Sequence, residues 1–181
     1  DLEVKLPPRA HRIESFISLS RTIGKQRVIL RYDPIILTDT YNYAFHVKAF
    51  DESCSLLHPY TEKVVFSYLD EYQKVSRNLR GLSLKHPSLE EKRQLASEFK
   101  KIANKYNLSL ESCAEKVDLS DLGIKRGRCI DGDLIEKIIG FSLKNKNKLD
   151  GNRELCGCMK CIDIGQYDSC IHSCLYCYAN I

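Results

Sequence analysis

Short apolar runs alternate with amphipathic stretches along the first 140 residues, and this alternation constrains the fold more than any other feature. The runs cover residues 27–33, 63–69 and 107–112. Between and before them, apolar residues recur at helical spacing over residues 10–23, 44–57 and 95–106. Strands that alternate with helices are typical of parallel βαβ units, whose sheets are covered on both faces. We therefore expect an α/β fold.

Local signals predict where several of these elements end. Gly24 should end the first helix, and Asp33-Pro34 should break the first strand. Ser88 and Glu91 have the spacing of a capping box, in which each side chain bonds to the other residue's backbone N–H. A short helix through Ile139 should begin at Asp131 or Asp133.

Three strands are too few to close a barrel, and the first helix has no strand before it. We therefore expect residues 1–141 to be the C-terminal part of a TIM-barrel-like fold whose first units precede Asp1. Residues 142–153 are polar and lysine-rich and are predicted to be a linker. Residues 154–181 are predicted to form a cysteine-rich, metal-binding tail.

Polar side chains gather where the predicted strands end. In barrels and open α/β sheets the chemistry takes place at this edge. Each of these side chains could also simply cap a turn or face solvent, but together on one rim they form a candidate substrate site. The candidate catalytic residues are Asp33, Tyr68, Asp70 and Glu115, and the candidate cofactor-binding residues are Arg31 and Tyr176.

Six of the nine cysteines lie in the last 26 residues. Cys170, Cys174 and Cys177 form a C-x3-C-x2-C run, a spacing that lets one loop direct three thiolates at a common centre. Grouped thiolates select zinc, copper(I) or an iron–sulfur cluster. Three ligands would leave one iron of a [4Fe-4S] cube open to another molecule.

Zinc is the alternative, because Cys158/Cys161 and Cys174/Cys177 form two C-x2-C pairs of the kind found in zinc ribbons. Disulfides are disfavoured by the odd number of cysteines and by the lack of a signal peptide at the start of the sequence. A reducing, cytoplasmic setting is therefore expected.

A second metal centre, a further cluster or zinc, is predicted from the remaining cysteines. Its ligands would be Cys113, Cys129, Cys156 and Cys158, with Cys161 as the alternative fourth ligand. The competing interpretation is that Cys113 and Cys129 are small buried apolar residues.

Composition excludes several classes of protein. No apolar run approaches the length of a membrane span. The net charge of +4 makes no case for nucleic acid as a partner. Neither a P-loop nor a GxGxxG motif is present. The histidines outside the tail, His46 among them, are expected to be exposed.

Several blocks resemble an uncharacterised prokaryotic family described as a domain of unknown function, whose C-terminal cysteines are similar to the cluster motif of radical S-adenosylmethionine (SAM) enzymes. The resemblance spans essentially the whole chain. The matching blocks are residues 26–35, 112–115, 123–125, 129–131, 153–158, 163–165 and 170–180.

The resemblance implies a [4Fe-4S] cluster on Cys170, Cys174 and Cys177, with SAM as a candidate second ligand. It implies an electron donor such as a ferredoxin or flavodoxin, and an unassigned small-molecule or macromolecular substrate. Radical SAM enzymes place this motif after their first strand, whereas here it lies at the end of the sequence. Two readings follow, a circularly permuted barrel or a cluster that transfers electrons without SAM.

Three functions are therefore expected in turn. The first is a radical SAM-like iron–sulfur enzyme. The alternative is a non-enzymatic metalloprotein with a structural zinc or an electron-transfer cluster. The third, which the modest charge disfavours, is a factor that modifies nucleic acid.

Overall fold

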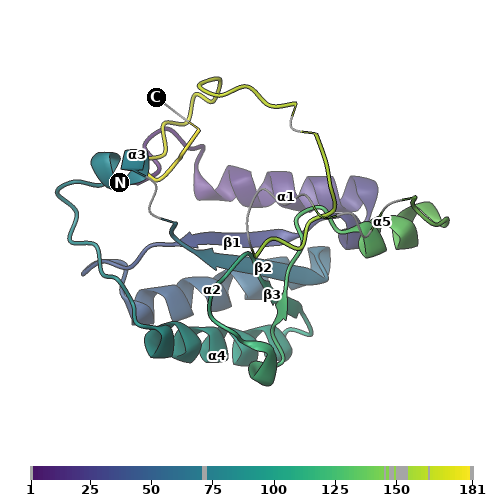
Figure 1. Cartoon of the computed structure of the whole chain (residues 1–181), viewed down its shortest axis with the longest axis horizontal. Helices are drawn as coiled ribbons and strands as arrows, with labels where there is room; N and C mark the ends of the chain where they lie inside the picture. The colour runs from purple at the N-terminus through teal and green to yellow at the C-terminus, as the bar shows by residue number, and fades with distance from the viewer. Residues whose placement is uncertain are drawn as a thin grey trace.

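The computed structural model describes residues 2–70, 73–144, 146, 149, 155–162 and 164–179. Its centre is a parallel sheet in which the strands follow one another in chain order (Figure 1). The α/β class and the parallel sheet are thus confirmed, and the described strands form an open sheet, not a closed barrel. The strands are β1 (Leu30–Ile35), β2 (Lys63–Tyr68), β3 (Ser109–Ser112) and β4 (Lys125–Arg126).

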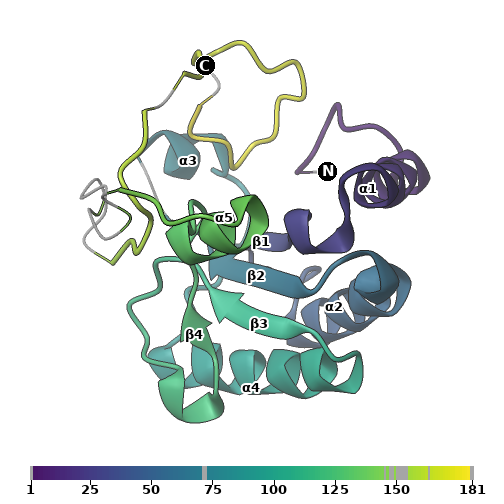
Figure 2. The same ribbon diagram turned by 90° about the vertical axis from the view of Figure 1, so that its right-hand side faces the viewer.

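The helices lie on both sides of this sheet. In Figures 1 and 2, α2 and α4 lie below the sheet, whereas α1, α3, α5 and the C-terminal segment lie above or beside its other face. The helices are α1 (Arg9–Ile23), α2 (Tyr43–Leu57), α3 (Gln73–Asn78), α4 (Leu89–Lys105) and α5 (Gly132–Ile139).

The face of the sheet toward α2 and α4 is apolar. Tyr32 of β1 and Phe66 of β2 point to this side and meet Phe50 of α2 and Phe99 of α4. The rings of Phe50 and Phe99 stack with their centroids 4.0 Å apart, and Phe50, Phe66 and Phe99 are fully buried. This cluster is the main hydrophobic core of the described chain.

The opposite face of the sheet is polar, because successive side chains of a strand point to opposite faces. Lys63 of β2 lies 2.8 Å from a carboxylate oxygen of Glu111 in β3 and 3.5 Å from one of Asp131. Arg31 and Asp33 of β1 form an ion pair on the same face. This face therefore carries charged groups, which partners hold in place, above an otherwise apolar scaffold.

The first strand differs from its prediction at both ends. Residues 25–27 form a 3-10 turn, so the strand begins at Leu30, and it continues through a cis Asp33-Pro34 bond to Ile35. The pairing with β2 shifts register between Tyr32 and Ile35. Proline lacks an N–H but is accommodated at edge strands and irregularities, and β1 is an edge strand. The prediction that Pro34 breaks the strand was wrong.

The predicted helix ends agree with the structure. Gly24 follows α1 with a φ of 92°, a conformation that favours glycine. Ser88 and Glu91 form the complete capping box of α4. Of the two candidates for α5, the N-cap is Asp131, whose carboxylate accepts from the amides of Asp133 and Leu134.

His46 corrects an expectation, since it is buried. One ring nitrogen lies 2.9 Å from the Tyr32 hydroxyl and the other 3.0 Å from the carbonyl oxygen of Ile36. The ring thereby ties α2 to the strand β1 and to the segment that follows it.

The start of the chain pairs with the cysteine-rich end. Glu3 forms an antiparallel bridge with Cys174, and the Leu175 amide donates to the carbonyl oxygen of Leu2 at 2.9 Å. Leu175 and Tyr176 also pack against a second, smaller core. The buried residues of that core are Leu2, Ile36, Val75 and Leu79.

Part of the predicted linker is bound to α5. The Glu136 carboxylate accepts from the Ser142 hydroxyl, from the Leu143 amide and from Lys146. Residues 145, 147, 148 and 150–153 of the predicted linker lie outside the described residues. The division of the chain at residues 141 and 154 stays a prediction. In the described part of the chain, no helix has both the length and the apolar character needed to cross a membrane.

Candidate metal-binding cavity

A cavity of about 550 Å³ opens at the carboxyl edge of the sheet, where the ends of β1, β2 and β3 meet the C-terminal segment. Arg31, Asp33 and Asp70 reach it from the sheet. Tyr176 reaches it from the tail. Seven of the nine cysteines line it: Cys113, Cys129, Cys156, Cys158, Cys161, Cys174 and Cys177.

Cys113 and Cys129 meet at the base of this cavity. Cys113 follows β3 and Cys129 lies between β4 and α5, and their sulfur atoms are 3.6 Å apart. A guanidinium nitrogen of Arg31 donates to Cys129 Sγ at 3.0 Å, while the same group binds Asp33. The hydrogen bond from Cys129 lowers the pKa of Cys113 to about 6, and Arg31 acts in the same direction against the effect of burial. The same bond raises the pKa of Cys129.

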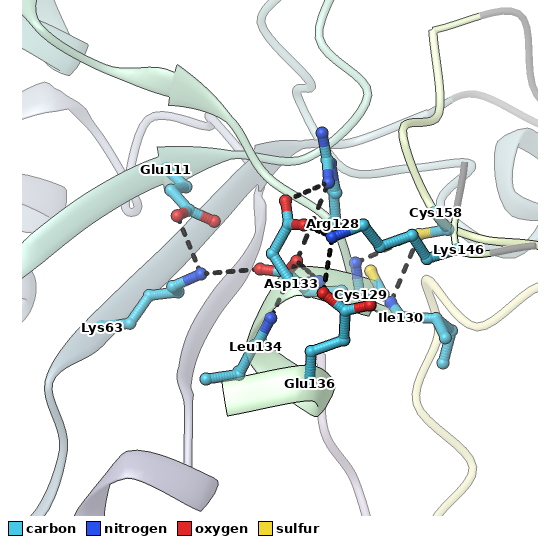
Figure 3. Close-up of polar contacts among 11 residues, drawn as sticks. Lys63, Glu111, Arg128, Cys129, Ile130, Asp133, Leu134, Glu136, Lys146 and Cys158 are labelled. Carbon is cyan, nitrogen blue, oxygen red and sulfur yellow. Dashed lines mark hydrogen bonds and ion pairs between the residues drawn. The ribbon is translucent and has the colours of Figure 1, made fainter. Parts of the chain in front are cut away.

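Cys158 is held by backbone amides of the loop that carries Cys129. The amide of Cys129 donates to Cys158 Sγ at 3.1 Å, and that of Ile130 lies 3.5 Å from the same sulfur (Figure 3). The Met159 amide in turn donates to the carbonyl oxygen of Ile130 at 3.0 Å. Burial is the main cause that raises the pKa of Cys156, with Cys158 and Cys129 close enough to interact with it. These bonds place the Cys156–Cys158 segment against the sheet.

A charged network supports the same loop from the side of α5. Arg128 binds Asp133 at 2.9 Å, and Lys146 binds Asp133 at 3.2 Å as well as Glu136 (Figure 3). Gly132 is buried at the start of α5, where a Cβ would lie 3.0 Å from that of Lys146. The sequence at this position therefore requires the smallest residue.

The C-x3-C-x2-C loop lies on the other side of the cavity. Cys174 and Cys177 line the cavity, and the Cys177 amide donates to the carbonyl oxygen of Cys174 at 3.1 Å. Cys170 is exposed and is not among the lining residues. Burial raises the pKa of Cys174, with further contributions from nearby groups that include Cys177 and Cys170.

The N-terminal segment holds this loop in place. The Tyr176 hydroxyl donates to Glu3 at 2.7 Å, and the Lys5 amide donates to the carbonyl oxygen of His172 at 3.1 Å. His172 points a ring nitrogen at the carbonyl oxygen of Lys5, 3.2 Å away. This use of His172 is structural within the described residues. Tyr176, a candidate cofactor-binding residue, thus has its hydroxyl on Glu3.

Two residues beside the cysteines have positive φ without being glycine. Ala114, next to Cys113, has a φ of 52°, and Ser173, next to Cys174, has a φ of 53°. Such conformations cost of order 1–3 kcal/mol and persist where the surroundings impose them. Both therefore show that the chain is bent to place a cysteine at the cavity.

The candidate catalytic residues divide into two groups. Asp33 and Asp70 line the cavity. The Tyr68 backbone also reaches the site, but its hydroxyl donates to the carbonyl oxygen of Lys92 in α4 at 2.9 Å. Glu115 is buried and accepts from the Tyr68 amide at 2.7 Å, with Lys92 3.8 Å away. Burial raises the pKa of Glu115.

The chemistry of the donor set fits a thiophilic metal or cluster. All nine cysteines are free thiols, and carboxylates are few at the cavity wall. In the described part of the chain, no three Cys, His, Asp or Glu side chains already surround a point closely enough to hold a metal ion. Occupation of the site would thus require small movements of the thiols that line one cavity.

Sequence reasoning missed the N-terminal segment that holds the cysteine loop. The alternation of apolar and polar residues over positions 1–5 is a strand signal that could have found it. The helix α3 and the two-residue strand β4 were also missed, since both are too short for a periodic pattern. Together these elements close the cavity.

A comparison with curated proteins finds no match, and a comparison with solved structures finds none either. A comparison with family models gives one result: the model described as a domain of unknown function, DUF1848, matches residues 1–179. With almost its whole length matched, this chain belongs to the DUF1848 family.

Proposed function

We propose that this chain is an iron–sulfur protein resembling radical SAM enzymes, in which Cys170, Cys174 and Cys177 bind a [4Fe-4S] cluster. The observation that carries the proposal is the position of Cys174 and Cys177, which line a cavity at the carboxyl edge of a parallel sheet. That edge is where α/β enzymes carry out their chemistry. The C-x3-C-x2-C spacing then accounts for three ligands with one iron left open.

The remainder of the cavity wall suits an anionic or zwitterionic ligand beside the cluster. Arg31 supplies a cation, paired with Asp33, and Asp70 supplies a second carboxylate at the opening. When bound, the cluster would supply electrons at low potential and an open iron for SAM. In this proposal Arg31 and Asp33 orient the ligand, while Glu115 and Tyr68 fix the end of β2 behind it.

The order of the strands supports a partial barrel as the architecture. Doubly wound sheets reverse their strand order at a switch point, whereas barrels keep neighbours in chain order. Here β1 to β4 follow one another without reversal. We propose that further βα units complete a TIM-barrel-like fold around the polar face.

The partners follow from this chemistry. The cluster would need a donor such as a ferredoxin or flavodoxin, and the substrate would be a small molecule or a macromolecular side chain that enters the cavity. We expect the protein to act in the reducing cytoplasm, where thiols remain free.

Anaerobic purification and reconstitution test the cluster directly. Wild-type protein should be brown and carry about four iron and about four sulfide ions at this centre. Cys174→Ala should lose them, whereas Cys161→Ala, a cysteine of the same cavity outside the motif, should keep them. Iron retained in full by Cys174→Ala would contradict the assignment.

A second measurement decides between a SAM enzyme and the alternative. Reconstituted protein with SAM and dithionite should release 5′-deoxyadenosine. A cluster that never cleaves SAM supports electron transfer alone, and a colourless protein with zinc at Cys170, Cys174 and Cys177 supports a structural site.

A further inference from the structure

We propose that Cys113, Cys129, Cys156 and Cys158 form a second metal centre, which holds a single tetrahedral ion of the zinc class and fastens the C-terminal segment to the sheet. It is separate from the cluster of the proposed function, so either can fail without the other. The four thiols come from three places in the chain: the end of β3, the loop before α5, and the tail.

The first argument is the spacing of the sulfur atoms. Thiolates at about 2.3 Å from one tetrahedral ion lie about 3.8 Å from each other. The sulfurs of Cys113 and Cys129 are 3.6 Å apart, close to this value and well beyond a disulfide bond of about 2.05 Å. An iron–sulfur cube binds each cysteine to a different iron and so spreads the sulfurs further. The spacing therefore favours one ion over a cluster.

The second argument is the set of donors around the sulfurs. Cys158 is buried, and its sulfur faces the backbone amides of both Cys129 and Ile130. Arg31 donates to the Cys129 sulfur. Four thiolates around a divalent ion carry a net negative charge, which needs such donors around it. A cluster of uncharged thiols would not require a guanidinium and two amides aimed at sulfur.

The third argument is what the ion would connect. Cys129 lies between β4 and α5, where the Gly127 amide bonds to the carbonyl oxygen of Ser112 at 2.7 Å. The tail at Cys156 and Cys158 touches this loop through few backbone bonds, such as that of Met159 to Ile130. One ion would join β3, the loop and the tail. It would thereby fix one wall of the cavity, with the C-x3-C-x2-C loop as the other.

The test uses a variant without the first centre, Cys170→Ser/Cys174→Ser/Cys177→Ser, reduced and titrated anaerobically with Co²⁺. Binding of about one ion per chain should appear, with the visible bands of a tetrahedral thiolate site, and Zn²⁺ should displace it. Adding Cys113→Ser or Cys158→Ser should abolish these bands. Adding Cys161→Ser, the matched control, should leave them.

A second measurement uses the intact chain and does not depend on how the variants fold. Iodoacetamide should modify Cys113, Cys129, Cys156 and Cys158 only after a chelator has removed zinc, as mapped by mass spectrometry. Cobalt bands that survive Cys113→Ser, alkylation that ignores zinc, a Cys113–Cys129 disulfide in reduced protein, or iron and sulfide bound at these four cysteines would each overturn the proposal.

Discussion

The two faces of the sheet are held by different physics. The face toward α2 and α4 is packed with rings such as Phe50, Phe66 and Phe99, which water does not reach. The opposite face carries ion pairs, half-buried thiols and a tail held by a few hydrogen bonds. Apolar burial of the first kind needs no ligand. The second face has free thiols instead of packed side chains, and its order depends on what they bind.

This difference teaches where stability and function reside in the molecule. Local stability varies within one fold, and binding sites are drawn from its less stable parts. The small core of Leu2, Ile36, Val75 and Leu79 is the link between the two regions. It supports the cysteine loop through Leu175 and Tyr176 without joining the main core.

The largest expected effect comes from the main core. Phe99→Ala removes a fully buried ring that stacks on Phe50 and should lower the free energy of unfolding by about 3–5 kcal/mol. Urea denaturation followed by circular dichroism measures it. Phe141→Ala, at an exposed ring, should change stability by no more than about 0.5 kcal/mol. Equal losses for the two would mean that the apolar face is not the scaffold.

A substitution in the small core should separate the two regions. Leu79→Ala empties a buried position and should cost about 2–4 kcal/mol, felt first by α3 and the cysteine loop. Hydrogen exchange should accelerate over residues 172–177 before it does in the strands, and metal content should fall. The exposed Leu82→Ala is the matched control. Uniform acceleration across the chain would show that the regions unfold together.

The third prediction uses the pH dependence of stability. Burial lowers the pKa of His46, whose ring is neutral between Tyr32 and Ile36. The unfolded chain takes up a proton near pH 6.5 and the folded chain resists it, so stability is complete above about pH 6.5 and falls below it. The slope should reach at most about 1.4 kcal/mol per pH unit. His46→Gln, at equal metal content, should remove this slope, and parallel curves would contradict the prediction.

The smallest effect concerns the backbone beside Cys113. Ala114 has a positive φ, so Ala114→Gly should relieve about 1–2 kcal/mol of strain, partly offset by about 0.4–1 kcal/mol of added freedom in the unfolded chain. A gain of up to about 1 kcal/mol is expected in thermal unfolding. Ala49→Gly, within α2, should instead lose about 0.5–1 kcal/mol. A loss at Ala114 would mean that the cavity wall tolerates no added freedom there.

Sequence reasoning succeeded where a local pattern carries the structure. The capping box of Ser88 and Glu91, the N-cap at Asp131 and the parallel order of the strands could all be predicted, since periodicity and short-range bonds determine them. The gathering of Arg31, Asp33 and Asp70 at one edge follows from parallel strands alone. These features need no information about distant contacts.

The rest depends on contacts that no local pattern encodes. His46 gave no sign of burial because its partners, Tyr32 and Ile36, are on another element. The approach of Cys113 to Cys129 depends on how the loop after β4 turns back toward β3. Pro34 was misjudged because its tolerance depends on β1 being an edge strand.

The pairing of the N-terminal segment with the cysteine loop also governs when the site can form. Glu3 and Tyr176 are 173 residues apart in the sequence. A growing chain therefore makes the segment early and must wait for its partner until the sheet has been synthesised. Contacts of such long range form late, after the entropy of closing a long loop has been overcome. The cysteine loop thus becomes ordered on a finished scaffold, and a nascent chain whose last cysteines have not emerged cannot capture metal at this place.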